Sequence, residues 1–153
     1  MIFNETSDDK HRTGFSLIKY GLPLILIAII GVFAFRSYQS SMVTGHQTSA
    51  TSIMRDLYNR EVEFRMINRR YATLEELSAD GLIDKELASG VKDGYRFEID
   101  AKGDSFEIHA TPLIYGGTKS TGTMSFYMNQ ANVFTVADKG GGKASPNDTP
   151  VKE

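Results

Sequence analysis

The amino-acid sequence predicts an α+β fold, in which a long amino-terminal helix packs on a small antiparallel β-sheet of about four strands. Three features support this prediction: an apolar block near the start, apolar residues at helical spacing after it, and paired segments of alternating apolar and polar residues further on. The chain has 153 residues, which leaves room for one modest domain beyond the apolar block.

The apolar block covers residues 15–35 and contains one charged residue, Lys19. A helix of about 21 residues rises about 31 Å, the thickness of the hydrocarbon core of a bilayer. The block ends in FAFRSYQ, whereas a secretory signal peptide has a shorter apolar region that ends in small residues. We therefore expect a transmembrane helix over residues 15–36.

Basic residues are distributed unevenly about this block. Lys10, Arg12 and Lys19 lie at its amino end, whereas Arg36 is the basic residue next to the other end. The positive-inside rule then places the amino terminus in the cytoplasm and the rest of the chain outside. The sequence predicts a single-pass membrane protein.

Apolar residues continue at helical spacing after the block, so we expect the same helix to extend over residues 37–71 outside the membrane. A stripe at this spacing would face a sheet. Its expected members are Ile53, Leu57, Phe64, Ile67 and Tyr71, with Met54, Tyr58, Val62 and Met66 broadening it.

Residues 72–139 are expected to form a head domain. TLEELSADG has a capping box, Thr73 with Glu76, and a helix stop at Gly81, and IDKELASG predicts another helical turn closed by Gly90. YRFEID and SFEIHA then flank AKGD, and GTMSFYM and NVFTVAD flank NQAN, so each pair predicts a β-hairpin. Residues 140–153 are rich in Gly, Pro, Asn and Lys without apolar periodicity, and we expect a flexible tail there.

Residue types that carry chemistry form no recognisable constellation. Cysteine is absent, which excludes disulfides and cysteine nucleophiles. His11, His46 and His109 lie in three segments without metal-ligand spacing, and the glycines at 140–142 lack the setting of a phosphate loop. The carboxylates near the short helices are interpreted as solvated surface, with a calcium site as an alternative that no EF-hand pattern supports. We expect no enzymatic activity, metal or cofactor.

Arginines recur along the expected exported helix, at Arg55, Arg60, Arg65, Arg69 and Arg70. One interpretation is a weak contact with DNA phosphates. The other is paired surface charge, because Asp56 precedes Arg60 by four residues and Glu61 precedes Arg65 by four. The net charge of −2 does not indicate a nucleic-acid-binding protein, and we favour the pairing.

The stretch GFSLI before a long apolar helix resembles the amino terminus of type IV pilins and pseudopilins. The resemblance implies that a prepilin peptidase removes residues 1–14 as a leader by cutting after Gly14, and that Phe15 becomes the methylated first residue. The segments TLEELSADGLIDKELASGVKDGYRFEI, FEIHATP and GTMSFYMNQANVFTVADKGG resemble the heads of bacterial pilin-like proteins. The family also implies a pilin-like fold and a bacterial inner-membrane location.

Lys19 departs from the pattern of this family. Four residues after the Phe, most members carry a Glu that meets the free amino group of a neighbouring subunit. An ammonium group at Lys19 would repel that amino group. We therefore hypothesise a subunit that assembles weakly or takes a special place, such as the tip.

Two functional interpretations remain open. The first is a pilin-like structural subunit of a type IV pilus or a type II secretion pseudopilus, minor or at the tip. It would contact other pilin-like subunits through its apolar helix and an inner-membrane assembly platform, with the head reaching an extracellular filament. The alternative is an unprocessed single-pass inner-membrane protein that presents a pilin-like interaction domain.

Overall fold

A computed structural model describes the backbone of residues 12–152 and the side chains of residues 24–152. The first eleven residues of the expected leader lie outside this range. Gly14, Phe15 and Lys19 fall in the part that is described as backbone alone.

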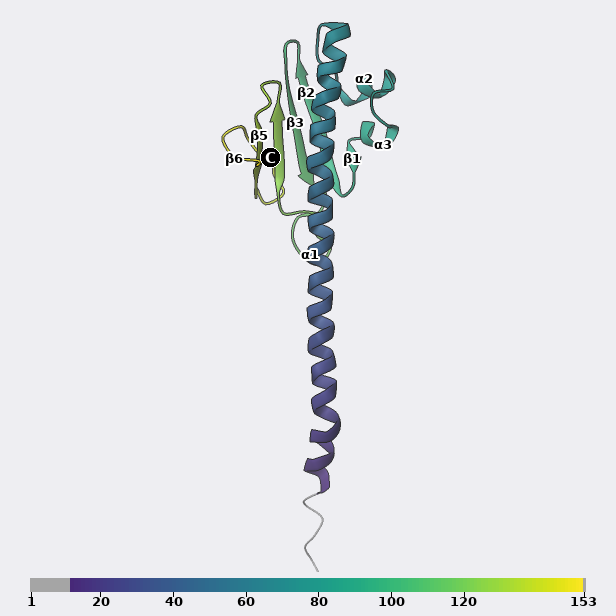
Figure 1. Ribbon diagram of the computed structural model, residues 1–153, viewed down its shortest axis with the longest axis vertical. Coiled ribbons are helices and arrows are strands. Elements are labelled where there is room, and N and C mark those ends of the chain that lie inside the picture. The colour runs from purple at the N-terminus through teal and green to yellow at the C-terminus, as the bar shows by residue number, and fades with distance from the viewer. Residues whose placement is uncertain (1–11, 153) are drawn as a thin grey trace, which may run out of the picture. The chain divides into compact units, whose positions relative to one another are not determined.

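Helix α1, Arg12–Asn68, is the longest element of the chain (Figure 1). The chain divides between Ser40 and Ser41 into two units, and α1 contributes to both. The first unit holds the apolar block. The second holds the remainder of α1 and all other elements, so the α+β class is confirmed for this unit.

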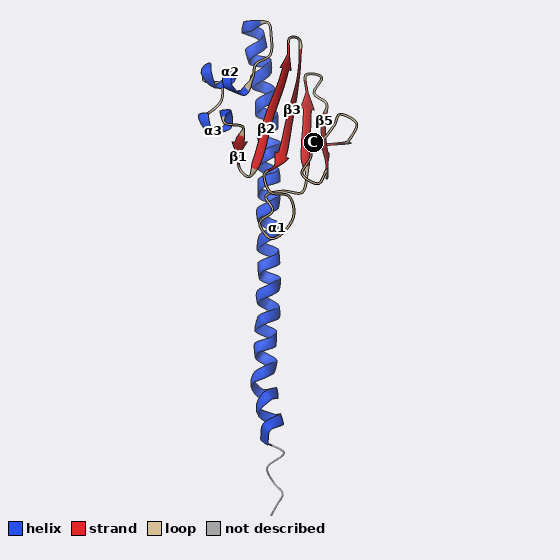
Figure 2. Ribbon diagram, turned by 180° about the vertical axis from the view of Figure 1, so that it is seen from behind, coloured by secondary structure: helices blue, strands red, loops and turns tan. Residues whose placement is uncertain are grey.

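The second unit contains a six-stranded antiparallel sheet in which each strand pairs with the next one in the chain, in the order β1-β2-β3-β4-β5-β6. Two short helices precede the sheet, and both lie to one side of α1 (Figure 2). The elements are α2 Leu74–Ala79, α3 Lys85–Ala88, β1 Val91–Lys92, β2 Tyr95–Lys102, β3 Ser105–Pro112, β4 Ser125–Asn129, β5 Phe134–Ala137 and β6 Thr149–Pro150.

Both predicted hairpins are confirmed, as β2–β3 and β4–β5. The expected number of strands was too low because β1 and β6 have two residues each, too few to show an alternating pattern. In the NQAN turn, Asn132 adopts a φ of 59°, and the Asn129 side chain accepts hydrogen bonds from the N–H groups of Ala131 and Val133. Asparagine thus supplies the left-handed residue of this turn.

The capping box at the start of α2 is also confirmed. The Thr73 hydroxyl accepts a hydrogen bond from the Glu76 N–H, and the Glu76 carboxylate accepts one from the Thr73 N–H. Gly81 follows α2 and Gly90 follows α3, with φ values of 72° and 76°. Glycine tolerates this left-handed conformation, which explains why both helices end where the sequence predicts.

The core of the second unit lies between α1 and one face of the sheet. Phe106 on β3 contacts the ring of Tyr71 edge-on, with centroids 4.6 Å apart, and lies 5.9 Å from the ring of Tyr58. Other large members of the cluster include Met54, Leu57, Phe64, Phe97, Ile108, Phe126 and Phe134. Alternation along β2, β3 and β4 places the remaining side chains on the opposite face.

The buried stripe of α1 differs from the expected one. Ile67 was expected in the core but is 77% exposed, whereas Glu61 is fully buried. The buried positions are Ala50, Met54, Leu57, Glu61 and Phe64. Steps of four and three residues return to the same side of a helix, and this line runs through Glu61 and not through Ile67.

Residues 140–152 are not the structureless tail that we expected. The Thr135 hydroxyl donates a hydrogen bond to the Ser145 carbonyl, and Lys143 forms an ion pair with Glu98. Strand β6 then pairs with β5, and Ala144 is buried. Since Thr135 and Glu98 lie on the sheet face opposite α1, this segment covers part of that face.

Candidate membrane anchor and head surfaces

The apolar side chains of residues 24–38 on α1 are exposed. The helix is long and apolar enough to span a membrane. Phe33 is 77% exposed, and all large apolar side chains described in this stretch are similarly open: Leu24, Ile25, Leu26, Ile27, Ile29, Ile30, Val32, Phe35 and Tyr38. A large aliphatic or aromatic side chain left in water forgoes about 1.5–3 kcal/mol relative to burial. Apolar surroundings would therefore lower the free energy of this stretch.

The three residues that the resemblance singles out lie at the start of α1. Gly14, Phe15 and Lys19 are all within Arg12–Asn68, so their backbone is helical. Their roles in processing and assembly stay predictions, because only their backbone is described. No feature of the head bears on them.

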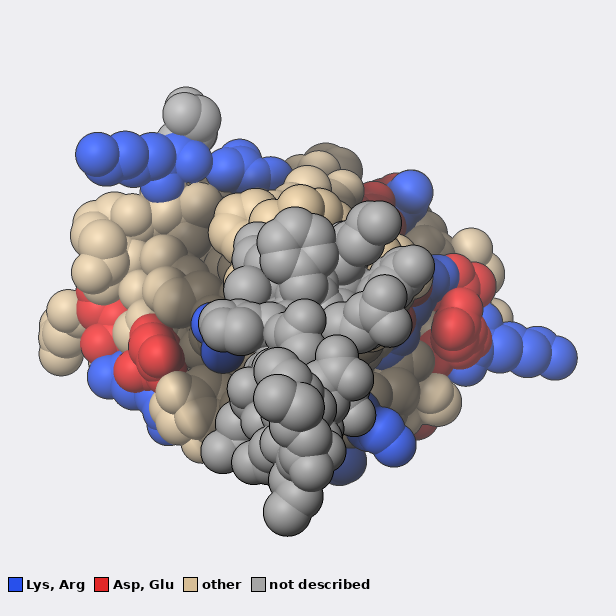
Figure 3. All heavy atoms as spheres, turned by 90° about the horizontal axis from the view of Figure 1, so that it is seen from below, with Lys and Arg blue, Asp and Glu red and all other residues tan. Residues whose placement is uncertain are grey.

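Three arginines of α1, Arg55, Arg60 and Arg65, have partners within the head. Arg60 forms the predicted ion pair with Asp56, at 3.4 Å, and a second one with Glu63 at 3.1 Å. The guanidinium of Arg55 lies 5.4 Å from the centre of the Phe134 ring. Figure 3 shows red groups beside some of the blue ones on the visible face, and other blue groups, at the upper left, without a red neighbour. The contact with DNA phosphates stays a prediction.

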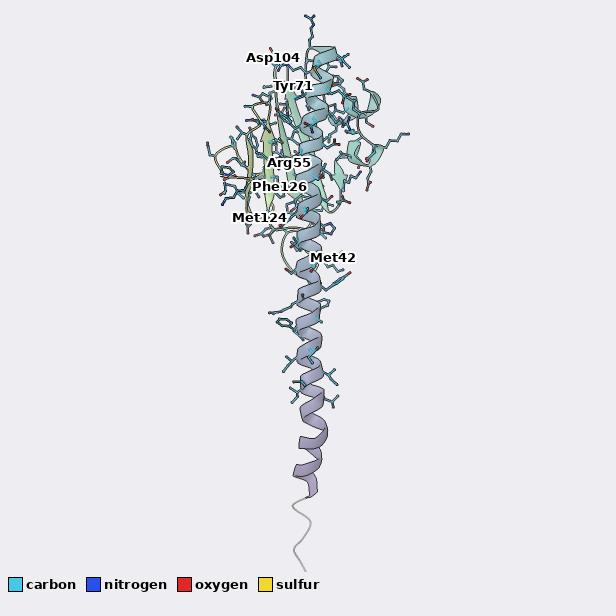
Figure 4. All side chains as sticks on the ribbon, viewed as in Figure 1. Met42, Arg55, Tyr71, Asp104, Met124 and Phe126 are labelled. Carbon is cyan, nitrogen blue, oxygen red and sulfur yellow. The ribbon has the colours of Figure 1, made fainter. Side chains whose placement is uncertain are left out.

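The predicted pair between Glu61 and Arg65 is wrong. Arg65 instead donates a hydrogen bond to the Tyr71 hydroxyl at 2.8 Å and lies 3.6 Å from the carboxylate of Asp104, in the turn between β2 and β3. Figure 4 shows Tyr71 and Asp104 toward the same end of the head. Side chains four residues apart on a helix are close enough to pair. The Glu61 side chain is instead buried with the core residues of α1, and it does not contact Arg65.

Glu61 connects α1 to the turn that leads to α2. One carboxylate oxygen accepts a hydrogen bond from the Ala72 N–H at 2.9 Å, and the other is buried without a hydrogen-bond partner. Burial raises the pKa of Glu61 to about 7, against the lowering effect of the Ala72 N–H. The sequence spacing could have indicated that Glu61 is buried, because Glu61 follows Leu57 by four residues and precedes Phe64 by three.

A row of polar side chains crosses the sheet face opposite α1. Glu98, His109, Tyr127 and Thr135 lie opposite one another on adjacent strands. The Tyr127 hydroxyl lies 3.2 Å from a carboxylate oxygen of Glu107, and the Tyr127 ring meets His109 edge-on at 5.4 Å.

His109 lies in this row between Glu98 and Tyr127. Its side chain is largely buried, and its Nδ1 atom has no hydrogen-bond partner. Burial, with the nearby charge of Lys143, lowers the pKa of His109 below its usual range. A neutral imidazole under the carboxyl-terminal segment is a packing group here, and within residues 24–152 no three metal-ligating side chains converge.

No protein-family model, curated protein or solved structure matches this chain. The functional proposal therefore rests on the residues of the chain itself.

Proposed function

We propose that this protein is a pilin-like structural subunit that is held in the bacterial inner membrane by the first part of α1 and carries its head outside. The single observation that carries the proposal is the exposed apolar surface of residues 24–38, joined through the same helix to a head of helix on sheet. A helix of this kind is stable in lipid or against the apolar helices of neighbouring subunits. A subunit that leaves the bilayer for a filament uses both environments in turn.

The GFSLI stretch supports a specific processing step. In this proposal a prepilin peptidase cuts after Gly14, and Phe15 is then methylated at its new amino group. The apolar helix is kept after this cut, because residues 15–35 follow the cleavage site. The mature chain would therefore stay anchored until it is assembled.

Intact-mass spectrometry of the membrane fraction tests this step, in a bacterium that has a prepilin peptidase. We expect a species that lacks residues 1–14 and carries one additional methyl group. The matched control is Gly14→Val, in which a branched side chain stands at the cleaved bond and the full-length mass should persist. If the unaltered chain also stays at full length, the structural-subunit proposal is wrong.

Lys19 supports a minor or tip position. A subunit at the tip has no neighbour ahead whose amino group would meet its side chain, so an ammonium group is tolerated there. Along the body of a filament the two positive charges would repel each other in surroundings of low dielectric. This hypothesis covers both a type IV pilus and a type II secretion pseudopilus.

A charge series at this position tests the hypothesis. Lys19→Gln removes the positive charge, and Lys19→Glu replaces it with a negative one. We expect incorporation into sheared filaments, measured by quantitative immunoblot, to rise from the unaltered chain to Lys19→Gln and again to Lys19→Glu. Equal incorporation of all three chains would count against the charge argument.

The departure at Lys19 also favours a second candidate, an unprocessed single-pass protein whose head binds partners at the membrane. This candidate needs the anchor but neither cleavage nor assembly. A full-length membrane species together with absence from sheared filaments would support it.

A further inference from the structure

The loop between β3 and β4, residues 113–121, exposes three consecutive large apolar side chains. Leu113 is 40% exposed, Ile114 46% and Tyr115 44%. Single exposed apolar residues are common on protein surfaces, but adjoining ones point to contact with a partner. The loop is part of the second unit and is absent from its core.

Hydrogen bonds within the head hold this loop in place. The Leu113 N–H donates to the Gly94 carbonyl at 2.9 Å, and the Thr121 N–H donates to the Ile114 carbonyl at 2.9 Å. The Ile114 N–H donates to the Thr121 hydroxyl, and the Tyr115 hydroxyl donates to Asp138 at 2.8 Å. The apolar side chains are thus exposed on a defined backbone.

The loop lies at the end of the head where α1 enters it. The side chain of Gln47 donates a hydrogen bond to Thr123 at 3.0 Å, just after the loop, whereas Arg65 reaches Asp104 at the opposite end of the sheet. Figure 4 shows Met124 toward the Met42 end of the unit and Asp104 at the far end. In Figure 1 the loop extends beyond the ends of β3 and β4, on the side where α1 enters the head.

A short stretch of chain joins the apolar block to the first residue of the head. Ser41, where the second unit begins, follows Arg36 by five residues. Five residues reach at most about 18 Å when fully extended, whatever their conformation. The headgroup layer on each side of the hydrocarbon core is about 5–8 Å thick. Ser41, the first residue of the head, is therefore close enough to the apolar block for this end of the head to reach the headgroups.

The side chains of the loop suit that layer. Tyrosine is enriched at the membrane interface, where its ring lies in the apolar part and its hydroxyl keeps a polar partner, here Asp138. Lys119 is exposed on the same loop and forms no ion pair with any side chain among residues 24–152. Its stem can lie along the apolar layer while its ammonium group reaches phosphates.

We propose that residues 113–121 form a membrane-contacting loop, which inserts Leu113, Ile114 and Tyr115 into the headgroup layer of the bilayer that holds the apolar block. The occupant of this surface is lipid. The inference rests on the proposed membrane anchor, and it assigns the head a fixed lipid-facing end before any assembly.

The absence of tryptophan from the chain permits a direct test. A single tryptophan is placed in the loop by Ile114→Trp, in the anchor by Ile30→Trp, or in the β4–β5 turn by Val133→Trp. Val133 is the matched control because it is also partly exposed but lies in a turn at the opposite end of the sheet. The full chain is reconstituted into phosphatidylcholine vesicles whose acyl chains carry bromine, a quencher of tryptophan fluorescence, in both leaflets.

We expect Ile114→Trp to be quenched and blue-shifted, with stronger quenching by bromine near the headgroups than by bromine near the chain ends. Ile30→Trp should show the opposite depth dependence, and Val133→Trp should not be quenched. Leu113→Trp is a second reporter, which keeps the test valid if Ile114→Trp fails to fold by circular dichroism.

Each other outcome is decisive. Quenching of Ile30→Trp without quenching of either loop reporter would leave the anchor standing and overturn the loop contact. A blue shift without quenching would mean that protein, such as a second copy, covers the loop, and would also overturn it. Equal quenching of Val133→Trp and Ile114→Trp would show adsorption of the whole head and remove the assignment to this loop. An unquenched Ile30→Trp would instead refute the proposed anchor.

Discussion

Replacing the buried Glu61 by glutamine should stabilise the head at neutral and higher pH. The carboxyl group has a pKa of about 7 in the folded protein against an ordinary value of 4.5. Between these two pH values the folded state holds a proton that the unfolded state has already lost. Stability therefore falls as pH rises from 4.5 to 7 and stays lower above 7. Glutamine is neutral at all pH values and keeps an acceptor for the Ala72 N–H.

The size of this effect follows from the shift. The difference of about 2.5 between the folded and the ordinary pKa corresponds to at most about 3 kcal/mol, at about 1.36 kcal/mol for each pKa unit. Residual screening by solvent reduces it, so we expect Glu61→Gln to raise the free energy of unfolding by about 2 kcal/mol at pH 8. Near pH 4 the two proteins should differ by about 0.5 kcal/mol or less, because the glutamate is then protonated in both states.

Urea unfolding of the full chain in detergent micelles, followed by near-ultraviolet circular dichroism, measures this difference at pH 4, 6 and 8. The comparison with the unaltered chain cancels the contribution of His109. Its lowered pKa acts in the opposite direction, because the unfolded state takes up a proton more readily than the folded state as pH falls below about 6.5. The matched control is Glu63→Gln, which changes a half-exposed carboxylate of the same helix turn that is paired with Arg60. It should change stability by less than about 0.5 kcal/mol at each pH. A destabilised Glu61→Gln at pH 8, or a difference that does not shrink toward pH 4, would refute the reasoning.

Three further predictions concern the head. Thr73→Ala removes the capping box of α2 and should lower the free energy of unfolding by about 1 kcal/mol in urea titrations, whereas no change would mean that the cap is dispensable. Gly122→Ala places a Cβ atom 2.1 Å from the Tyr95 hydroxyl, so thermal unfolding should show a loss of about 1–3 kcal/mol, and an unchanged Tm would contradict this packing. A chain that ends at Lys139 loses β6 and the hydrogen bond from Thr135, so amides of β5 should exchange hydrogen faster than in the full chain; unchanged exchange would show that the segment does not protect the sheet.

Local patterns predicted much of the fold correctly. The β2–β3 and β4–β5 hairpins follow from alternation of side chains along each strand, and the start of α2 follows from Thr73 and Glu76. These signals lie within a few residues of one another, and the chain satisfies them without reference to distant contacts. The candidate anchor could also be predicted locally, because its length and composition are properties of one continuous segment.

Other features depend on contacts between distant segments and could not be predicted in this way. Strand β6 forms because the partner edge of β5 is available, although its own two residues carry no strand pattern. The composition of residues 140–153 suggested a flexible tail, yet Lys143 forms an ion pair with Glu98 on β2. The helical spacing that suggested a pair between Glu61 and Arg65 did not reveal that one of them is buried.

By itself, the sequence determined an apolar helix fit for a bilayer, the capped short helices and the two hairpins, because each depends on side chains close together in the chain. Only the tertiary structure decided that Glu61 lies in the core, that residues 140–150 cover part of one face of the sheet, and that residues 113–115 are exposed at the end of the head that holds Gln47. These depend on which surfaces of α1 and the sheet meet, since the desolvation of a side chain is set by all the segments that surround it.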